Sequence, residues 1–267
     1  MKYLKMFNEN INTSEIEAIC KKYNITNYTI NEDGSIDVDG NVYLCHKNLK
    51  VLPLKFRKVS GNFKCGFNKL TSLKGSPQSV GGWFECNDNQ LTSLVGCTQY
   101  IGGIFYCGYN QLTSLESAPQ SVGGDFSCIS NHLTSLEGSP QSVGGDFSCS
   151  GNQLTSLVGG PKRVGGDFWC HSNKLKNIDY LPKYYKELLI GDNPIYKIIK
   201  LFTTSNRMGF LYDNRENKDL IMDFIDREII QQDKLLVNRL VEFLDDIDKL
   251  KTREELIELL KNDYEIR

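Results

Sequence analysis

Apolar and polar positions repeat along the middle of the chain with a fixed period of 21 residues. Each unit opens with a phenylalanine, which is followed two residues later by a cysteine and then by an asparagine and two apolar residues, in the pattern F-x-C-x-x-N-x-L-x-x-L. A period of this length is typical of a solenoid, in which each unit forms one coil. The repeated residues are Phe63, Phe84, Phe105, Phe126, Phe147 and Phe168, with Cys65, Cys86, Cys107, Cys128, Cys149 and Cys170.

The alternation within F-x-C predicts a short strand. Its period of two places Phe and Cys on one side, facing inward, and the residue between them on the other. Stacked coils are expected to pair these strands into a parallel β-sheet, with a spacing of roughly 4.8 Å. Two weaker units flank the six: Tyr43, Cys45 and Asn48 begin the first, with Leu44 facing outward, and residues 188–195 (LLIGDNPI) form the last. We therefore expect about eight coils.

Asparagine and glycine have separate predicted roles in each coil. The asparagine ends the strand, and its amide is expected to bond backbone groups that the turn leaves open. Glycine pairs permit backbone conformations and close contacts between coils that a side chain would block. These pairs fall at 81–82, 102–103, 123–124, 144–145 and 165–166.

The unit resembles the leucine-rich repeat, because it matches the consensus L-x-L-x-x-N-x-L with Phe and Cys in two leucine positions. It is similar to the short repeats of bacterial type-III effectors, with their N-x-L-x-x-L-P pattern. It also resembles uncharacterised repeat proteins of tailed bacteriophages and other large DNA viruses, in which N-x-L-T-S-L and V-G-G-D-F recur. The resemblance implies a leucine-rich-repeat solenoid with a usually concave strand face. It leaves the function open, since such scaffolds serve many unrelated partners.

Both ends of a solenoid expose apolar surface and need caps. Residues 14–23 (SEIEAICKKY) predict a short amphipathic helix, with Ser14 and Glu17 spaced as a capping box. Residues 28–38 alternate around Asn-Glu-Asp-Gly, which indicates a hairpin. Together these two elements are expected to cover the first coil.

After Pro194 a helical period replaces the repeat. It predicts helices over 217–232, 234–250 and 252–263, and the last of these opens with a capping box. The chain is therefore predicted to be an α+β protein with three parts. These are an N-terminal α/β cap (1–41), a leucine-rich-repeat-type solenoid (42–196) and a helical C-terminal domain (197–267).

Composition and charge bear on the function and the compartment. Of the 267 residues, 40% are apolar and 24% are charged, which is ordinary for a soluble globular protein. A net charge of −2 gives no reason to expect nucleic acid or an anionic membrane as a partner. No stretch has the apolar length of a signal peptide or a membrane span. We expect a cytoplasmic protein, in the host cytoplasm if the protein is viral.

Nine cysteines, an odd number without an export signal, argue against a secreted disulfide scaffold. The six repeated cysteines are expected to face inward, where a free cysteine behaves as a small apolar side chain. Zinc sites draw their ligands to one point, whereas repeated coils spread thiols along a line. Cys97, outside the six, is expected to be the most exposed thiol. No metal and no cofactor are therefore expected.

The pattern contains no recognisable catalytic site. Some effectors similar to this repeat class carry a ubiquitin-ligase domain that works through a cysteine thioester, but this chain has no cysteine after Cys170. The three histidines, His46, His132 and His171, lie in repeat turns without a nucleophile nearby in the pattern. An enzyme with an unrecognised site in the helical tail remains an alternative, although the tail's charged residues have the spacing of solvated helix faces.

The outward side of the strands is the remaining candidate site. Exposed aromatic residues beside a row of one charge sign are typical of a protein-binding face. The aromatic residues break the copied pattern, which favours binding, whereas the repeated aspartates have an open alternative role as caps of turn amides. We predict a non-enzymatic scaffold for a protein partner, with a structural component of a larger assembly as the alternative. The predicted contacts are Trp83, Ile104, Tyr106, Asp125, Asp146, Asp167 and Trp169.

Overall fold

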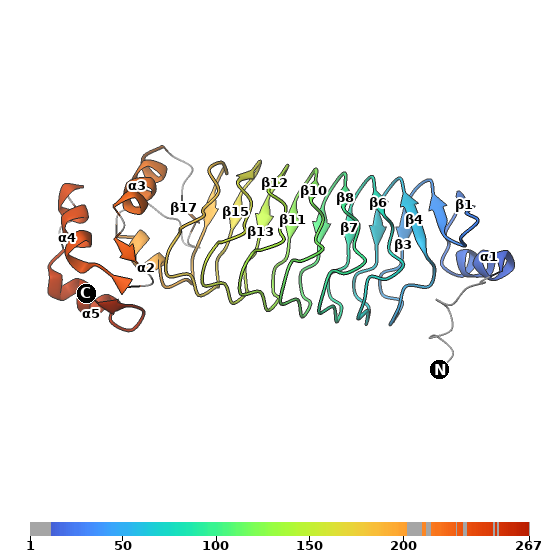
Figure 1. Cartoon of the computed structure of the whole chain (residues 1–267), viewed down its shortest axis with the longest axis horizontal. Helices are drawn as coiled ribbons and strands as arrows, with labels where there is room; N and C mark the ends of the chain where they lie inside the picture. The colour runs from blue at the N-terminus through green and yellow to red at the C-terminus, as the bar shows by residue number, and fades with distance from the viewer. Residues whose placement is uncertain are drawn as a thin grey trace.

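The structure of the chain is a computed structural model, which describes residues 12–201, 210–211, 215–227, 229–231, 234–247, 249 and 251–266. A straight stack of parallel coils forms its long body, with one helix at the N-terminal end and a helical region at the C-terminal end (Figure 1). The chain is thus an α+β β-solenoid, which confirms the predicted fold class.

The predicted strand face is present as one sheet. Eight parallel strands follow one another up the stack, and β17 (Phe210–Leu211) adds an antiparallel strand at the far edge. The pairing keeps the repeat in register, so that Phe126 lies opposite both Phe105 and Phe147. From the first to the last, the parallel strands make seven full turns. They are β3 (Val42–Tyr43), β5 (Phe63–Lys64), β7 (Phe84–Glu85), β9 (Phe105–Tyr106), β11 (Phe126–Ser127), β13 (Phe147–Ser148), β15 (Phe168–Trp169) and β16 (Leu188–Leu189).

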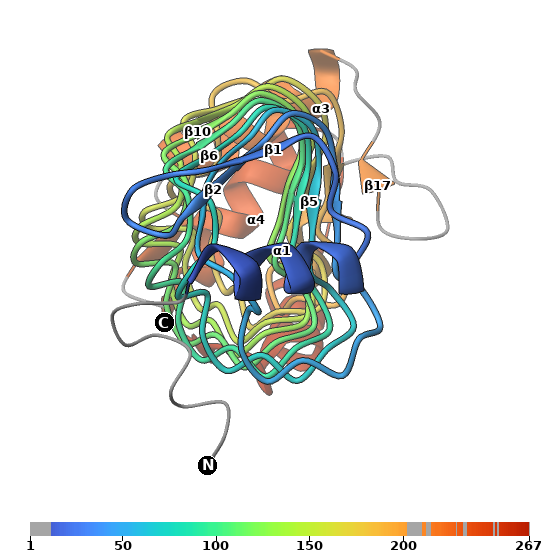
Figure 2. The ribbon, with the colours of Figure 1, turned by 90° about the vertical axis from the view of Figure 1, so that its right-hand side faces the viewer.

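A second sheet forms the opposite wall, and the sequence pattern does not predict it. A view along the stack shows one sheet on either side of the coil (Figure 2). All but the first of its solenoid strands are only two residues long, with a single buried valine or isoleucine, so no alternation marks them in the sequence. These strands are β4 (Phe56–Val59), β6 (Ser79–Val80), β8 (Tyr100–Ile101), β10 (Ser121–Val122), β12 (Ser142–Val143) and β14 (Arg163–Val164).

Two walls made of strands explain why the stack is straight. Neighbouring strands are roughly 4.8 Å apart in both sheets, so neither side of a coil is wider than the other. A leucine-rich-repeat horseshoe places strands on one side and helices or 3₁₀ turns on the other, and a helix is roughly 10 Å wide. The concave curvature that the resemblance implies is not found over coils 42–196 (Figure 1).

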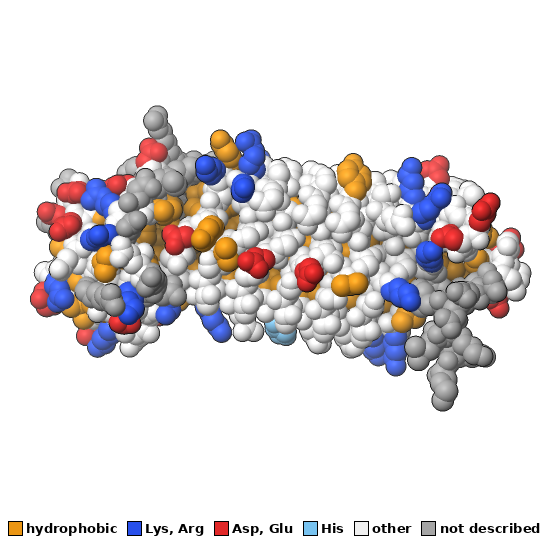
Figure 3. All heavy atoms as spheres, viewed as in Figure 1, with side chains coloured by type: hydrophobic (Ala, Val, Ile, Leu, Met, Phe, Trp, Pro, Cys, Tyr) orange, Lys and Arg blue, Asp and Glu red, His pale blue; other side chains and the backbone are white. Residues whose placement is uncertain are grey.

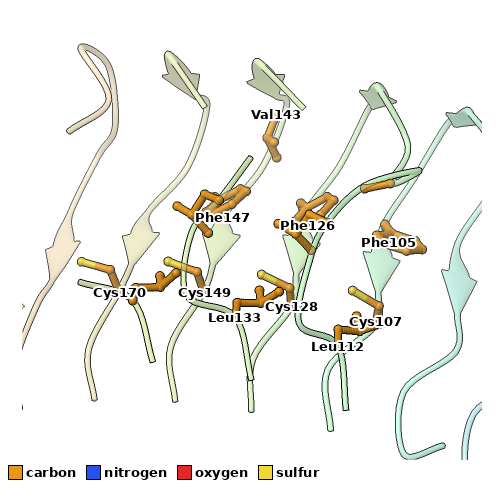
Figure 4. Close-up of a cluster of buried hydrophobic side chains, with 14 of the residues drawn as sticks. Phe105, Cys107, Leu112, Phe126, Cys128, Leu133, Val143, Phe147, Cys149 and Cys170 are labelled. Carbon is orange, nitrogen blue, oxygen red and sulfur yellow. The ribbon is translucent and has the colours of Figure 1, made fainter. Parts of the chain in front are cut away.

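The interior confirms the predicted alternation. Phe126 and Cys128 are fully buried and point into the coil together with Leu133 (Figure 4). Val143 enters the same interior from the opposite wall (Figure 4). From Phe63 to Phe168, the ring centroids of consecutive phenylalanines are 5.2–5.7 Å apart. Each buried phenylalanine stabilises the fold by roughly 1.5–3 kcal/mol, so the stacked rings form a large part of the core.

The first coil begins one residue earlier than predicted. Val42 pairs with Phe63, and Val42 and Leu44 are buried while Tyr43 is 54% exposed. The prediction that Tyr43 and Cys45 face inward and Leu44 outward is therefore wrong. Three consecutive apolar residues allow either alternation, and the observed one keeps the tyrosine hydroxyl in solvent and preserves the spacing of 21.

The asparagines bond the turn as predicted, and they also join neighbouring coils. The Nδ2 of Asn131 donates to the carbonyl oxygens of Cys107, Cys128 and Ile129 at 3.1–3.2 Å. Its Oδ1 accepts the backbone N–H of Leu112 at 3.0 Å. Each such asparagine thus satisfies buried backbone groups of two coils at once. The same arrangement recurs at Asn89, Asn110, Asn152, Asn173 and Asn193.

The glycine pairs serve the close approach of coils. A Cβ built on Gly123 would lie 2.2 Å from the carbonyl oxygen of Gly102, and one on Gly144 would lie 2.0 Å from that of Gly123. Neither Gly123 nor Gly144 has a positive φ. The contact between coils, rather than an unusual backbone conformation, is therefore the reason for glycine at these positions.

The N-terminal cap contains the predicted helix and hairpin. The helix α1 (Thr13–Lys22) lies across the open end of the first coil (Figure 2). It begins after Asn12, whose Oδ1 accepts the backbone N–H of Glu15 at 2.9 Å, so the predicted capping box of Ser14 and Glu17 is wrong. The hairpin of β1 (Tyr28–Ile30) and β2 (Ile36–Val38) continues the second sheet, because β2 pairs with β4.

The C-terminal region is helical, with an additional small sheet. Tyr264 is buried, and its hydroxyl donates to the carbonyl oxygen of Lys176 at 2.8 Å, which joins this region to the solenoid. Ile229, predicted on a helix, lies beyond the end of one and is buried. The predicted capping box of Thr252 and Glu255 is confirmed. The elements are α2 (Tyr196–Ile199), α3 (Arg215–Asp226), α4 (Val237–Asp246) and α5 (Arg253–Leu260), with β18 (Ile230–Gln231), β19 (Lys234–Leu235) and β20 (Glu265–Ile266).

Candidate binding groove on the strand face

The outward residues of the first sheet vary from coil to coil. In the middle of the strands, Lys64, Glu85, Tyr106 and Ser127 are partly exposed, whereas Ser148 is buried. The inward-facing residues of the same coils, by comparison, are nearly the same from coil to coil. Seen from the side of the return segments, by contrast, the surface over the middle coils is mostly uncharged, and charged side chains gather toward both ends (Figure 3).

A groove of about 570 Å³ lies over β9, β11, β13 and β15. Large side chains, Tyr106 on β9 and Trp169 on β15, stand at its two ends, and the small side chains of Ser127 and Ser148 lie between them. Because these strands are only roughly 4.8 Å apart, serines between aromatic residues leave a hollow on an otherwise straight wall. The groove brings together five of the seven predicted contacts: Ile104, Tyr106, Asp125, Asp146 and Trp169.

Several residues that line the groove were not predicted. They lie three and four positions after the phenylalanine, shortly beyond the end of each strand. The alternation that turns the residue before Cys outward also turns the residue after it outward. The sequence therefore contained a signal for the residues three positions after the phenylalanine. These residues are Tyr109, Ile129, Ser130, Ser150, Gly151, His171 and Ser172.

Trp83 and Asp167, the other two predicted contacts, do not line the groove. Trp83 is 42% exposed, and the Nζ of Lys64 lies 4.6 Å from the centroid of its indole ring. The same Nζ forms an ion pair with Glu85 at 2.8 Å. The early coils therefore place a cation of their own between an indole and a carboxylate.

The aspartates cap backbone amides, which is the alternative role that the sequence alone left open. The Oδ1 of Asp125 accepts the backbone N–H of Asp146 at 2.9 Å, and the Oδ1 of Asp146 accepts that of Asp167 at 2.8 Å. In the early coils, Asn41 and Asn62 cap the next coil in the same way, at 2.7 and 2.8 Å. A neutral amide is therefore sufficient for the cap, so the negative charge of the aspartates has no role in it.

The second carboxylate oxygen is open in both aspartates that line the groove. Among the described residues, the Oδ2 atoms of Asp125 and Asp146 accept no hydrogen bond, and neither carboxylate forms an ion pair. The lining contains no lysine or arginine. The groove thus presents two negative charges without a cation from the described part of the chain.

Two buried hydroxyls form part of the groove floor. Ser148 and Ser150 are 5% and 4% exposed, and neither Oγ has a hydrogen-bond partner within the described residues. A buried polar group without a partner costs about 1–3 kcal/mol. Such groups are rare in folded proteins, so each hydroxyl calls for a partner that the described residues do not supply.

Tyr106 and His171, at the two ends of the groove, are neutral at neutral pH. Burial raises the pKa of Tyr106 to about 12, so its phenol keeps its proton. Burial lowers the pKa of His171 below its ordinary value, so its imidazole is uncharged at pH 7. Its Nδ1 lies 3.0 Å from the hydroxyl of Ser172. The charge of the groove therefore comes from Asp125 and Asp146.

The thiols do not form a reactive site. The six repeated cysteines are fully buried, and burial raises the pKa of each thiol above its ordinary value, so they remain protonated. Cys97 is only partly exposed, and so is Cys45, which the shifted first coil places outside the interior. In the described part of the chain, no three His, Cys, Asp or Glu side chains are arranged to hold a metal ion. None of the described helices has both the length and the apolar character of a membrane span.

No family model and no curated protein matches this chain. The function of the strand face is therefore inferred from its own residues and their geometry.

Proposed function

We propose that the chain is a non-enzymatic scaffold that binds a protein partner through the exposed face of the β3–β16 sheet. The observation that carries this proposal is the groove between Tyr106 and Trp169. It forms where the outward positions differ from their neighbours, on a backbone that is otherwise repeated. A volume of about 570 Å³ lies within the range of ligand-binding clefts, roughly 300–1,000 Å³.

The residue types of the groove support a protein as the partner. Tyrosine and tryptophan are enriched in protein interfaces and among the few residues that supply most of the binding energy. Both are rigid and offer an apolar ring together with a polar group. The two carboxylates beside them add a charge that a complementary surface can recognise.

The origin and location of the protein are part of the same proposal. The F-x-C-x-x-N-x-L unit and the recurring N-x-L-T-S-L string support a leucine-rich repeat of viral type. If the protein is viral, as we propose, it acts on host proteins in the cytoplasm of the host cell.

The proposal is tested by affinity capture with the full chain from extracts of the cells in which it is made. The groove variant Tyr106→Ser/Trp169→Ser introduces the residue that β11 and β13 already carry at this position, so the coil tolerates it. The matched control Tyr100→Ala/Tyr184→Ala removes two aromatic side chains, 54% and 55% exposed, that lie on the second wall and do not line the groove.

We expect proteins that the wild type and the control retain to be lost from the groove variant, while all three chains keep similar melting temperatures. Retention of the same proteins by all three chains would show that this face is not the binding surface.

A further inference from the structure

The chain itself shows how a cation fits this face. In the early coils, the ammonium group of Lys64 lies between the indole of Trp83 and the carboxylate of Glu85, at 4.6 Å from the ring centroid and 2.8 Å from the carboxylate oxygen. A cation gains from both neighbours, because the ring face is electron-rich and the carboxylate is negative. The same kinds of group recur in the groove without the lysine.

The two carboxylates of the groove favour a cationic group supplied by a binding partner. Asp125 and Asp146 each keep one carboxylate oxygen that no described residue bonds. They are consecutive members of one row and directly precede β11 and β13, which are roughly 4.8 Å apart, so their charges repel each other. A cation relieves this repulsion, whereas a phosphate or an acidic peptide increases it.

The hydroxyls of the floor accept the same kind of ligand. The Oγ atoms of Ser148 and Ser150 have no hydrogen-bond partner among the described residues, and each can accept a hydrogen bond. Lysine and arginine side chains carry only donors, three and five N–H groups respectively. Carboxylate and hydroxyl acceptors on the groove floor therefore complement a basic side chain.

We propose that the groove receives an extended segment of the partner protein that carries a basic side chain, with arginine preferred to lysine. The inference rests on the proposed binding function and names the chemistry of the occupant. Arginine is preferred because its planar guanidinium group stacks on an aromatic ring while it donates to a carboxylate. From β9 to β15 the groove is roughly 14 Å long, which about four extended residues span.

A pair of variants isolates the charge from the fold. Asp125→Asn/Asp146→Asn removes both charges but keeps the Oδ1 acceptor that caps the next coil, as Asn41 and Asn62 already do. The matched control Glu116→Gln/Glu137→Gln makes the same change in net charge. Both glutamates are exposed, and neither lines the groove.

The experiment selects peptides from a displayed library of random short sequences on the immobilised full chain. We expect the selected peptides to be enriched in arginine. One selected peptide is then labelled, together with a copy in which citrulline, the neutral isostere, replaces arginine, and binding is followed by fluorescence anisotropy. The aspartate variant and the citrulline copy should each weaken binding at least about tenfold, whereas the glutamate control stays at the wild-type value. Added salt should weaken binding of the arginine peptide more than that of the citrulline copy.

Three results would overturn the inference: peptides selected without basic residues, no peptide enriched on the wild type over the aspartate variant, or an equal loss in the glutamate control. They are separable from a failure of the proposed function. If affinity capture retains a partner that depends on Tyr106 and Trp169 while the library selects neutral sequences, the binding function stands and the basic occupant is wrong. If capture shows no dependence on the groove, the binding function itself fails.

Discussion

The coils around β5 and β7 and the coils around β11, β13 and β15 have the same interior and different faces. Both bury a phenylalanine, a cysteine and two aliphatic side chains per coil, two leucines in each except the β15 coil, which has Leu175 and Ile178, and both use an asparagine to join one coil to the next. On the face, the early coils pair Lys64 with Glu85, whereas the later coils carry Asp125 and Asp146 with no cation among the described residues. A constant interior fixes the backbone, so the face is free to vary, and only the early coils neutralise their own charge.

The largest expected effect tests whether the two interiors are equivalent. Phe84→Ala and Phe126→Ala should each lower the free energy of unfolding by about 4 kcal/mol, because each removes a fully buried ring from the same stack. Chemical denaturation of both variants measures the two values. Tyr43→Ala, at an exposed ring, is the control and should change stability by less than about 0.5 kcal/mol. If the two losses in the free energy of unfolding differed by half of either one or more, the interiors of the two regions would not be equivalent.

The asparagines should behave alike in the two regions as well. Asn89→Ala and Asn131→Ala should each cost about 3 kcal/mol, since each leaves carbonyl groups and one N–H without a partner in the interior. Denaturation curves measured side by side test this. A loss in only one of the two variants would show that the coils differ inside as well as outside.

A smaller effect is expected where coils touch through glycine. Gly123→Ala should cost about 2 kcal/mol, because its Cβ would lie 2.2 Å from the backbone oxygen of Gly102 and the coils would have to move apart. Thr113→Ala, at an exposed position of a return segment, is the matched control and should leave the melting temperature unchanged. If Gly123→Ala were as stable as the control, the coils would not be in close contact at this position.

The smallest expected effect is a pH dependence of stability that only the face of the later coils contributes. Burial lowers the pKa of His171 in the folded protein, so below its ordinary value of about 6.5 the unfolded chain binds more protons. Stability should therefore fall slightly as the pH drops below about 6.5. Asn87, at the equivalent position of an early coil, does not titrate. Denaturation between about pH 7.5 and about pH 5.5 should show a slope that His171→Gln removes, and a slope unchanged in that variant would assign it to other groups.

The sequence predicts the parts of the fold that rest on repeated alternation. Phe and Cys at a spacing of two define the inner face of the first sheet, and the asparagine marks its end. The second sheet escapes prediction because one buried residue per strand, such as Val80 or Val143, has no periodicity. The first coil is misplaced for a related reason, since Val42, Tyr43 and Leu44 are all apolar and fit either register.

The groove depends on information that lies across coils rather than along the chain. Tyr106 and Trp169 were identified because they break the repeat, but the hollow between them exists only because Ser127 and Ser148 are small on the intervening strands. Trp83 breaks the repeat equally, yet the cation of Lys64 already lies over its ring. The side chain of Lys64, on the coil next to that of Trp83, thus accounts for the difference between Trp83, whose ring already contacts a cation, and Trp169, which lines the groove.

The coil-to-coil contacts also bear on how such a protein changes over generations. Each coil offers its neighbour nearly the same surface on both walls, so a junction formed after losing or gaining one whole unit resembles the junction it replaces. The stretches 122–139 and 143–160 show two neighbouring units with nearly the same amino-acid sequence. Gain or loss of one unit would therefore change the length of the rod, and the distance between its capped ends, by roughly 4.8 Å without a new core.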